Sequence, residues 1–233
     1  MQLVIGNKNY SSWSMRPWVL MRALGLPFEE RMLRFDFHDA NSRFSAEAAK
    51  LSPTARVPVL LEADGFAVWD SLAMAERLHE CFPNAGVWPA DPRQRARARS
   101  LCASMHSGFG KLRSLCPMNI EADLRDIGRQ LVAQEPGLRA DLQQLEALWL
   151  PELTAHGGPW LFGAAFCAAD AFFAPVAMRV KGYGLPLAPP AQAYVEALSQ
   201  QSAVQEWVQA ALGEHHWVPE DEPYRQGPSS GQL

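Results

Sequence analysis

The chain has 233 residues, and its 21 Lys and Arg against 25 Asp and Glu give a net charge of −4. Hydrophobic residues make up 48% and charged residues 20%, a globular balance that excludes a disordered or fibrous chain. The mild negative charge argues against nucleic acid or an anionic membrane surface as partner, because both bind through many Lys and Arg side chains.

The first 82 residues alternate short β-type runs with helical ones. A buried strand is predicted at Leu3–Ile5, followed by a helix over Met15–Leu24 that ends at Gly25. The remaining predicted elements are strands at Phe28–Arg34, Val57–Leu61 and Phe66–Trp69, and a helix from Ser71 to Phe82. The order βαβ, a variable middle and ββα predicts a small mixed sheet with helices packed on it.

Beyond Pro83 the strand signals stop and helical patterns take over. Asp91 is suited to cap the first helix of this part, and leucines repeat at helical spacing from Leu124 to Leu148, with Pro136 between them. Further helices are predicted from Ala168, over Ala191–Ser199 and over Ala203–Leu212. We therefore expect an α/β domain at 1–82, an all-helical domain at 91–212, and a loosely ordered tail at 213–233.

Cysteine usage and hydropathy indicate an intracellular protein. The four cysteines are widely spaced, with no C-x-x-C pair, which is typical of a reduced, cytoplasmic chain: Cys81, Cys102, Cys116 and Cys167. No apolar run in the sequence approaches the length of ~20 residues that is needed to span a bilayer. The apolar run near the start is too short for the apolar core of a secretory signal. The six histidines lack the spacing of metal ligands, so no metal site is expected.

The loop between the first strand and the first helix is rich in hydroxyl groups. Ser11, Ser12 and Ser14 stand where a helix begins, with Pro17 expected in its first turn. A helix start offers free N–H groups and a partial positive charge, and a hydroxyl beside it can lower the pKa of a bound thiol. The simpler alternative is that Ser14 caps the helix and that Ser11 and Ser12 only solvate the loop.

Two later segments also suit the binding of a peptide-like ligand. Pro58 opens a predicted strand, and a cis bond after Val57 would turn the Val57 backbone toward a cleft; a trans proline at a strand entry is the alternative. Asp70 and Ser71 begin a helix, where a carboxylate, a hydroxyl and free N–H groups suit the ammonium and carboxylate of an amino acid. Capping of that helix by Ser71 is the plainer interpretation.

Together these segments resemble the cytosolic glutathione transferases, over about residues 2–212. That family joins a thioredoxin-like βαβ–ββα domain to an all-α domain. In the helical half, the run from Gly163 to Asp170 resembles the family's helix-start box G-x-x-x-[ST]-x-A-D, with Cys167 in place of Ser or Thr. The resemblance implies a homodimer that uses glutathione as co-substrate and a small electrophile as second substrate.

The resemblance also implies site residues. Ser11, five residues before Arg16, matches the serine whose hydroxyl binds the glutathione thiolate in zeta-like and tau-like classes, with Ser12 and Ser14 as alternatives and Tyr10 as a weaker one. The glutathione-binding positions that match are Val57 for the cysteinyl backbone, Asp70 and Ser71 for the γ-glutamyl end, and Arg56 and Arg43 for the glycine carboxylate.

The serine-rich run resembles the zeta-class pattern S-S-C-S-W-R, with Trp13 where that pattern has a cysteine. The main expectation is a transferase that activates the glutathione thiol for conjugation to a small electrophile. The alternatives are an isomerase of the maleylacetoacetate type, a non-catalytic glutathione-binding or interaction module, and a thiol–disulfide reductase. Met105, Phe109 and Arg113 recur every four residues and either line the electrophile pocket or, for the apolar pair, belong to the core.

Overall fold

The computed structural model describes residues 1–37, 39 and 41–227, and its first part is built around a four-stranded sheet. The strands are β1 (Gln2–Ile5), β2 (Glu29–Met32), β3 (Val59–Leu61) and β4 (Ala67–Trp69), in the order β2-β1-β3-β4. β1 runs parallel to β2 and antiparallel to β3, and β3 runs antiparallel to β4. This is the mixed βαβ–ββα sheet that the sequence predicts.

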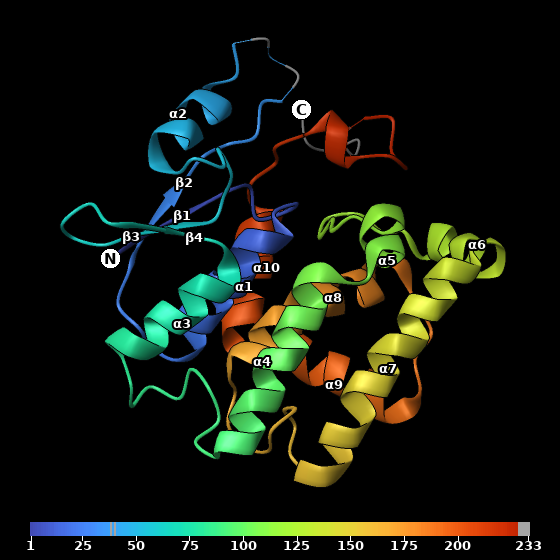
Figure 1. Cartoon of the computed structure of the whole chain (residues 1–233). Coiled ribbons are helices and arrows are strands. Elements are labelled where there is room, and N and C mark those ends of the chain that lie inside the picture. Colours follow the sequence, from blue (N-terminus) through green and yellow to red (C-terminus); the bar gives the residue numbers. More distant parts are fainter. Residues whose placement is uncertain (38, 40, 228–233) are drawn as a thin grey trace.

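Alternation along β1 gives the sheet two buried faces. Leu3 and Ile5 join the larger core on one face, with α1 (Ser12–Ala23) and α3 (Ser71–Cys81) packed there. Val4 points the other way and joins a smaller cluster with Phe44 of α2 (Arg43–Leu51). Figure 1 shows α2 on the opposite side of the sheet from α1 and α3.

The second part of the chain is helical. Its elements are α4 (Pro92–Ser107), α5 (Gly110–Leu115), α6 (Arg125–Gln134), α7 (Pro136–His156), α8 (Ala168–Tyr183), α9 (Pro189–Gln200), α10 (Ser202–Leu212) and the short 3₁₀ helix η1 (Pro219–Asp221). Asp91 caps α4 as expected, accepting hydrogen bonds from the backbone N–H groups of Arg93 and Gln94. No described helix combines the length and the apolar character needed to cross a membrane.

α1 connects the two parts of the chain. It packs on α8 and α10, where the rings of Trp18 and Trp207 meet edge to face with centroids 5.3 Å apart. The Trp207 indole N–H also donates to the carbonyl of Lys8, in the loop that precedes α1. The loop that carries the serines is therefore anchored from the helical side.

The box that begins α8 keeps its capping interaction despite the cysteine. Cys167 is the N-cap residue, and Oδ2 of Asp170 accepts from its backbone N–H at 3.0 Å. The other carboxylate oxygen of Asp170 accepts from the backbone N–H of Leu161 and from the Tyr194 hydroxyl. The buried Asp170 carboxylate thus connects the N-cap residue, the Leu161 backbone and Tyr194 at the start of α8.

Two local predictions differ from the structure, and one open alternative is decided by it. α1 begins at Ser12 rather than Met15, so Pro17 lies in its second turn and leaves the Trp13 carbonyl without the usual helical donor. The regular helix also breaks between Ser107 and Gly110, because Phe109 adopts a left-handed backbone with φ +58°. Met105 and Phe109 belong to the buried core, as the second of the two interpretations has it.

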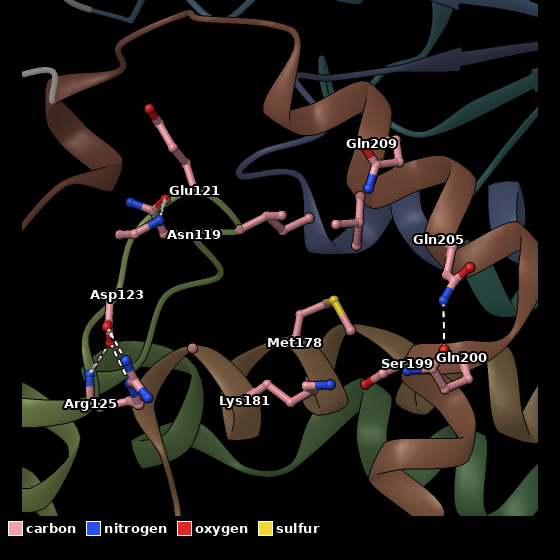
Figure 2. Close-up of a pocket in the computed structure, with 14 residues that line it drawn as sticks. Asn119, Glu121, Asp123, Arg125, Met178, Lys181, Ser199, Gln200, Gln205 and Gln209 are labelled. Atoms are coloured by element: carbon pink, nitrogen blue, oxygen red, sulfur yellow. Dashed lines mark hydrogen bonds and ion pairs between the residues drawn. The ribbon is translucent and has the colours of Figure 1, made fainter. Parts of the chain in front are cut away.

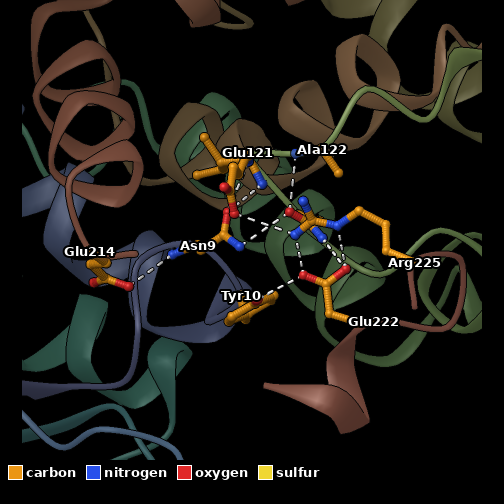
Figure 3. Close-up of polar contacts among 9 residues, drawn as sticks. Asn9, Tyr10, Glu121, Ala122, Glu214, Glu222 and Arg225 are labelled. Atoms are coloured by element: carbon orange, nitrogen blue, oxygen red, sulfur yellow. Dashed lines mark hydrogen bonds and ion pairs between the residues drawn. The ribbon is translucent and has the colours of Figure 1, made fainter. Parts of the chain in front are cut away.

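The prediction of a loosely ordered tail is wrong for residues 214–227. Glu222 is buried and accepts from the Tyr10 hydroxyl at 2.7 Å and from Nδ2 of Asn119 at 2.8 Å, and Arg225 pairs with it (Figure 3). Glu214 accepts from the backbone N–H of Lys8 at 2.7 Å. The polar composition that suggested disorder instead supplies long-range partners for the loop before α1.

Candidate functional site

Two adjoining cavities lie where the sheet part meets the helical part. The larger, of about 640 Å³, is bounded by the start of α1, the loop before β3, α5, α8 and η1. The smaller cavity, of about 220 Å³, reaches the start of α3 and the end of α4. The residues common to both walls are Trp13, Thr54, Arg56 and Val57. We call the two cavities together the cleft.

The structure separates the three serines of the loop. Ser11 and Ser12 line the larger cavity. Ser14 is fully buried, and its hydroxyl oxygen accepts from the Gly6 backbone N–H at 3.1 Å and from the Ser11 hydroxyl at 2.7 Å. The N-cap residue of α1 is Ser11 and not Ser14, so the interpretation of Ser14 as the helix cap is wrong.

Ser11 therefore lies at the positive end of a helix and on the wall of a cavity. Its side chain forms no capping bond to α1. The first N–H groups of the helix keep their partial positive charge near the hydroxyl, an environment that favours an anion.

Val57 and the residues beside it form the middle of the cleft. The Val57–Pro58 bond is cis, the first of the two alternatives that the sequence left open. Val57 and Arg56 line both cavities, and Arg56 is exposed. The strand entry before β3 thus runs along the cleft between Ser11 and α3.

Asp70 and Ser71 line the far end of the cleft. Asp70, rather than Ser71, caps α3: its Oδ1 accepts from the Leu72 backbone N–H at 2.8 Å, and its backbone has φ +80°. The Ser71 hydroxyl is buried and has no hydrogen-bond partner within the described part of the chain. A buried hydroxyl without a partner is costly in the free protein, so it is suited to bind a polar ligand.

Arg43 is the expected site residue that the structure places elsewhere. It is the first residue of α2, is exposed, and is not among the described residues that line the cleft. Its neighbours Phe44 and Ser45 do line the larger cavity.

Several residues of the cleft were not assigned to the site from the sequence. The cleft walls also include Trp13, His106, Arg179 and Asp221. Nε2 of His106 lies 3.2 Å from Oδ2 of Asp70, and its ring meets Trp13 with centroids 5.0 Å apart. Trp13 directly follows Ser12 in the serine-rich loop. No local pattern points to the other three, because each is brought to the cleft by a different distant segment.

Ionisable groups of the cleft have altered pKa values. Burial, followed by the nearby charges of Glu220 and Glu222, raises the pKa of Asp221 to about 6. Burial lowers the pKa of Arg179 to about 10. Burial and the hydrogen bond to Glu222 raise the pKa of Tyr10. The Tyr10 phenol is thus engaged with the tail and stays protonated.

The sequence was compared with models of known families and with known proteins. Residues 10–81 match the model of the glutathione S-transferase N-terminal domain. A probable maleylacetoacetate isomerase of Caenorhabditis elegans is 29% identical over 189 residues, covering 77% of this chain and 81% of that one. Glutathione S-transferase 1 of Dianthus caryophyllus is 26% identical over 189 residues, covering 81% of each.

Solved structures agree with the sequence comparisons. A glutathione transferase homologue from Burkholderia, crystallised with bound glutathione, superimposes with a TM-score of 0.65 at 28% identity, covering 90% of this chain and 97% of the other. The fold is therefore a thioredoxin-like domain followed by an all-helical domain, as the sequence predicted. Residues 10–81 thus carry a glutathione S-transferase N-terminal domain, and the chain as a whole is similar to glutathione S-transferases in sequence and fold.

Proposed function

We propose that the chain is a glutathione transferase that binds glutathione along the cleft and activates its thiol at Ser11 for conjugation to a small electrophile. The observation that carries this proposal is the alignment of Ser11, Val57 and the Asp70–Ser71 pair along one cleft. The Burkholderia homologue, 28% identical to this chain, was crystallised with bound glutathione, which supports glutathione as the ligand.

In this mechanism the Ser11 hydroxyl donates a hydrogen bond to the thiolate, and the start of α1 adds its partial positive charge. Both interactions favour the anion over the thiol, so the nucleophile forms at neutral pH. Ser11 exchanges its donation to Ser14 for donation to sulfur by a rotation of its hydroxyl, while Ser14 keeps the Gly6 N–H. The thiol proton leaves to solvent through the open cleft.

The remaining contacts hold the tripeptide. Asp70 and the unpartnered Ser71 hydroxyl receive the γ-glutamyl ammonium and carboxylate, and the Val57 backbone pairs with the cysteinyl unit. Arg56 is placed for the glycine carboxylate, with Arg43 as a more distant cation from α2. We also propose a homodimer, supported by the exposed Phe66 and Trp69 at the edge strand β4.

Titration of the bound glutathione thiol by its thiolate absorbance tests this function. We expect the thiol pKa to fall on binding to the wild type, and the Ser11→Ala variant to lose most of that fall. Ser100→Ala, an exposed serine on α4, serves as the control and keeps the shift. Binding without a shift would instead indicate a non-catalytic module, and loss of the shift only in Ser12→Ala would transfer the role to Ser12.

A second candidate is a glutathione-dependent isomerase, favoured by the curated relatives named maleylacetoacetate isomerase, among them the one of Rattus norvegicus at 26% identity. In that case glutathione adds to the substrate and is released again. Isomerisation of maleylacetoacetate without consumption of glutathione would establish this alternative. Steady loss of glutathione with an electrophile supports conjugation.

A further inference from the structure

Three arginines from three different helices gather beside Ser12 and Trp13. The guanidinium carbon of Arg16, on α1, lies 4.1 Å from the Trp13 ring centroid, and that of Arg113, on α5, lies 5.5 Å from it. Arg179, on α8, donates from Nη2 to the Ser12 hydroxyl at 3.2 Å. Arg113 and Arg179 line the larger cavity, while Arg16 is buried against Trp13 and Phe172.

Throughout the described residues, no carboxylate forms an ion pair with any of these three arginines. Arg179 donates to the carbonyls of Cys116 and Pro175, and Arg113 to that of His106. Nε and Nη1 of Arg16 lack any hydrogen-bond partner among the described residues, although the side chain is only 2% exposed. Burial and the charges of Arg179 and Arg113 lower the pKa of Arg16 to about 9.

A buried cation without a counter-charge is unfavourable, and here two of them, Arg16 and Arg179, lie beside the half-buried Arg113. Asp70 acts on Arg16, but its carboxylate is already engaged by the Leu72 N–H and His106. Asp221 lines the larger cavity with Arg113 and Arg179 but forms no ion pair with either of them within the described residues. The free protein therefore keeps an excess of positive charge at the cavity wall. A ligand that brings an anion to Arg113 and Arg179 would relieve this cost.

A separate cavity of about 610 Å³ in the helical part shows the opposite arrangement (Figure 2). Its two cations are both paired, Arg125 with Asp123 and Lys181 with Glu196. It shares no lining residue with the cleft. The cations of that cavity each have a carboxylate partner, whereas Arg16, Arg113 and Arg179 have none within the described residues.

We propose that the second substrate is an electrophile that carries an oxyanion, held by Arg113 and Arg179 beside Ser12, with Arg16 adding charge from behind Trp13. This inference rests on the proposed transferase function and names its substrate class. The anion lies on the helical side of Ser11, whereas Arg56 and the Asp70–Ser71 pair serve the carboxylates of glutathione. Trp13 and Met118 offer apolar surface for the body of the substrate.

The test compares 4-chloro-3-nitrobenzoate with its neutral amide, 4-chloro-3-nitrobenzamide. In both, the thiolate sulfur attacks the ring carbon that bears chlorine, a C–S bond forms, and chloride leaves with the electron pair of the C–Cl bond. Values of kcat/KM are divided by the uncatalysed rates, so the acid-to-amide ratio reports only recognition of the carboxylate. The variants are Arg113→Gln, Arg113→Lys and, as control, Arg97→Gln, an exposed arginine on α4.

We expect the acid to be preferred by the wild type, and Arg113→Gln to reduce the ratio roughly tenfold to a hundredfold, the range for a lost hydrogen bond to a charged group. Arg113→Lys should restore part of the ratio, and Arg97→Gln should leave it unchanged. An unchanged ratio in Arg113→Gln overturns the proposal. An unchanged ratio with a raised KM for glutathione also overturns it, because the anion would then belong to glutathione.

A binding measurement separates this proposal from the proposed function. Calorimetric titration of wild type and Arg113→Gln with the benzoate and with the benzamide needs no turnover. Arginine-dependent binding of the benzoate in a protein that does not ionise glutathione would overturn the transferase function and retain the anion site. Equal binding of acid and amide to the wild type would overturn the anion site, whatever the activity toward glutathione.

Discussion

The hydroxyl of Ser11 donates a hydrogen bond to the hydroxyl oxygen of Ser14, 2.7 Å away, and Ser14 in turn accepts from the Gly6 backbone N–H. One serine thus faces the cavity while the other, fully buried, fixes the end of β1 against α1. Two neighbouring residues of the same type divide a functional and a structural role between them. This division leads to opposite expectations for their alanine variants.

Ser14→Ala should lower the free energy of unfolding by about 1–3 kcal/mol, because the buried Gly6 N–H loses its acceptor. Ser11→Ala should leave stability nearly unchanged and reduce kcat/KM with glutathione by roughly tenfold or more. Urea unfolding and steady-state kinetics on the two variants provide the measurements. A larger stability loss in Ser11→Ala than in Ser14→Ala would contradict the assignment.

Ser71→Ala should weaken glutathione binding without destabilising the protein. The Ser71 hydroxyl is buried and unpartnered among the described residues, so its removal costs the free protein no internal hydrogen bond. We expect a roughly threefold to tenfold rise in Kd for glutathione, measured by calorimetry, with Tm unchanged or higher. The cap residue gives a contrast: Asp70→Ala should cost about 0.5–2 kcal/mol of stability as well.

Glu222→Ala should release the tail from the serine loop. Glu222 is buried and pairs with Tyr10, Asn119 and Arg225 (Figure 3). Its loss leaves the Tyr10 hydroxyl and the Asn119 amide without their acceptor and removes one of the two carboxylates that pair with Arg225. We expect a loss of roughly 3 kcal/mol or more in urea unfolding and faster proteolytic cleavage after Leu212. Glu220→Ala, an exposed acidic residue in the same turn, is the control. Equal protease resistance of both variants would show that Glu222 does not hold the tail.

Asp221→Asn should stabilise the protein at pH 7.5 but not at pH 4. Burial raises the pKa of Asp221 from 3.8 to about 6, so the folded state binds a proton more tightly than the unfolded state does. The stability from this proton is present below pH 3.8 and is lost as the pH rises through about 6. We expect a gain of roughly 1–2 kcal/mol at pH 7.5, measured by denaturant unfolding at both pH values; an equal gain at both would contradict it.

Phe66→Ser should favour the monomer if β4 forms the edge of a dimer interface. Phe66 is 57% exposed and Trp69 41% exposed, both beside the last strand of the sheet. Sedimentation at several protein concentrations measures the dissociation, which should increase at least tenfold for the loss of a large apolar contact of about 1.5–3 kcal/mol. Leu212→Ser, an exposed apolar residue at the end of α10, is the control.

Much of the fold was predictable because its signals are local. The sheet strands follow from apolar runs such as Leu3–Ile5, and the helix starts from caps such as Asp91. The ends of these elements were less accurate: α1 begins three residues before the predicted Met15. Pro17 lies in the interior of α1, a position that helix propensity alone disfavours. The helix forms there nonetheless, and the next residue, Trp18, packs against Trp207 of α10.

The site likewise contains residues that local sequence patterns predict and residues that only the tertiary structure brings together. Ser11, Val57, Asp70 and Ser71 stand at element boundaries, where caps and turns have sequence patterns, and all four line the cleft. The sequence by itself determined these positions and the order of the elements. Arg113 and Arg179 reach Trp13 and Ser12 only through the tertiary structure, and so does Glu222 in its contact with Tyr10, because these contacts join segments up to 212 residues apart. Such contacts depend on how helices pack, and no spacing within one segment encodes them.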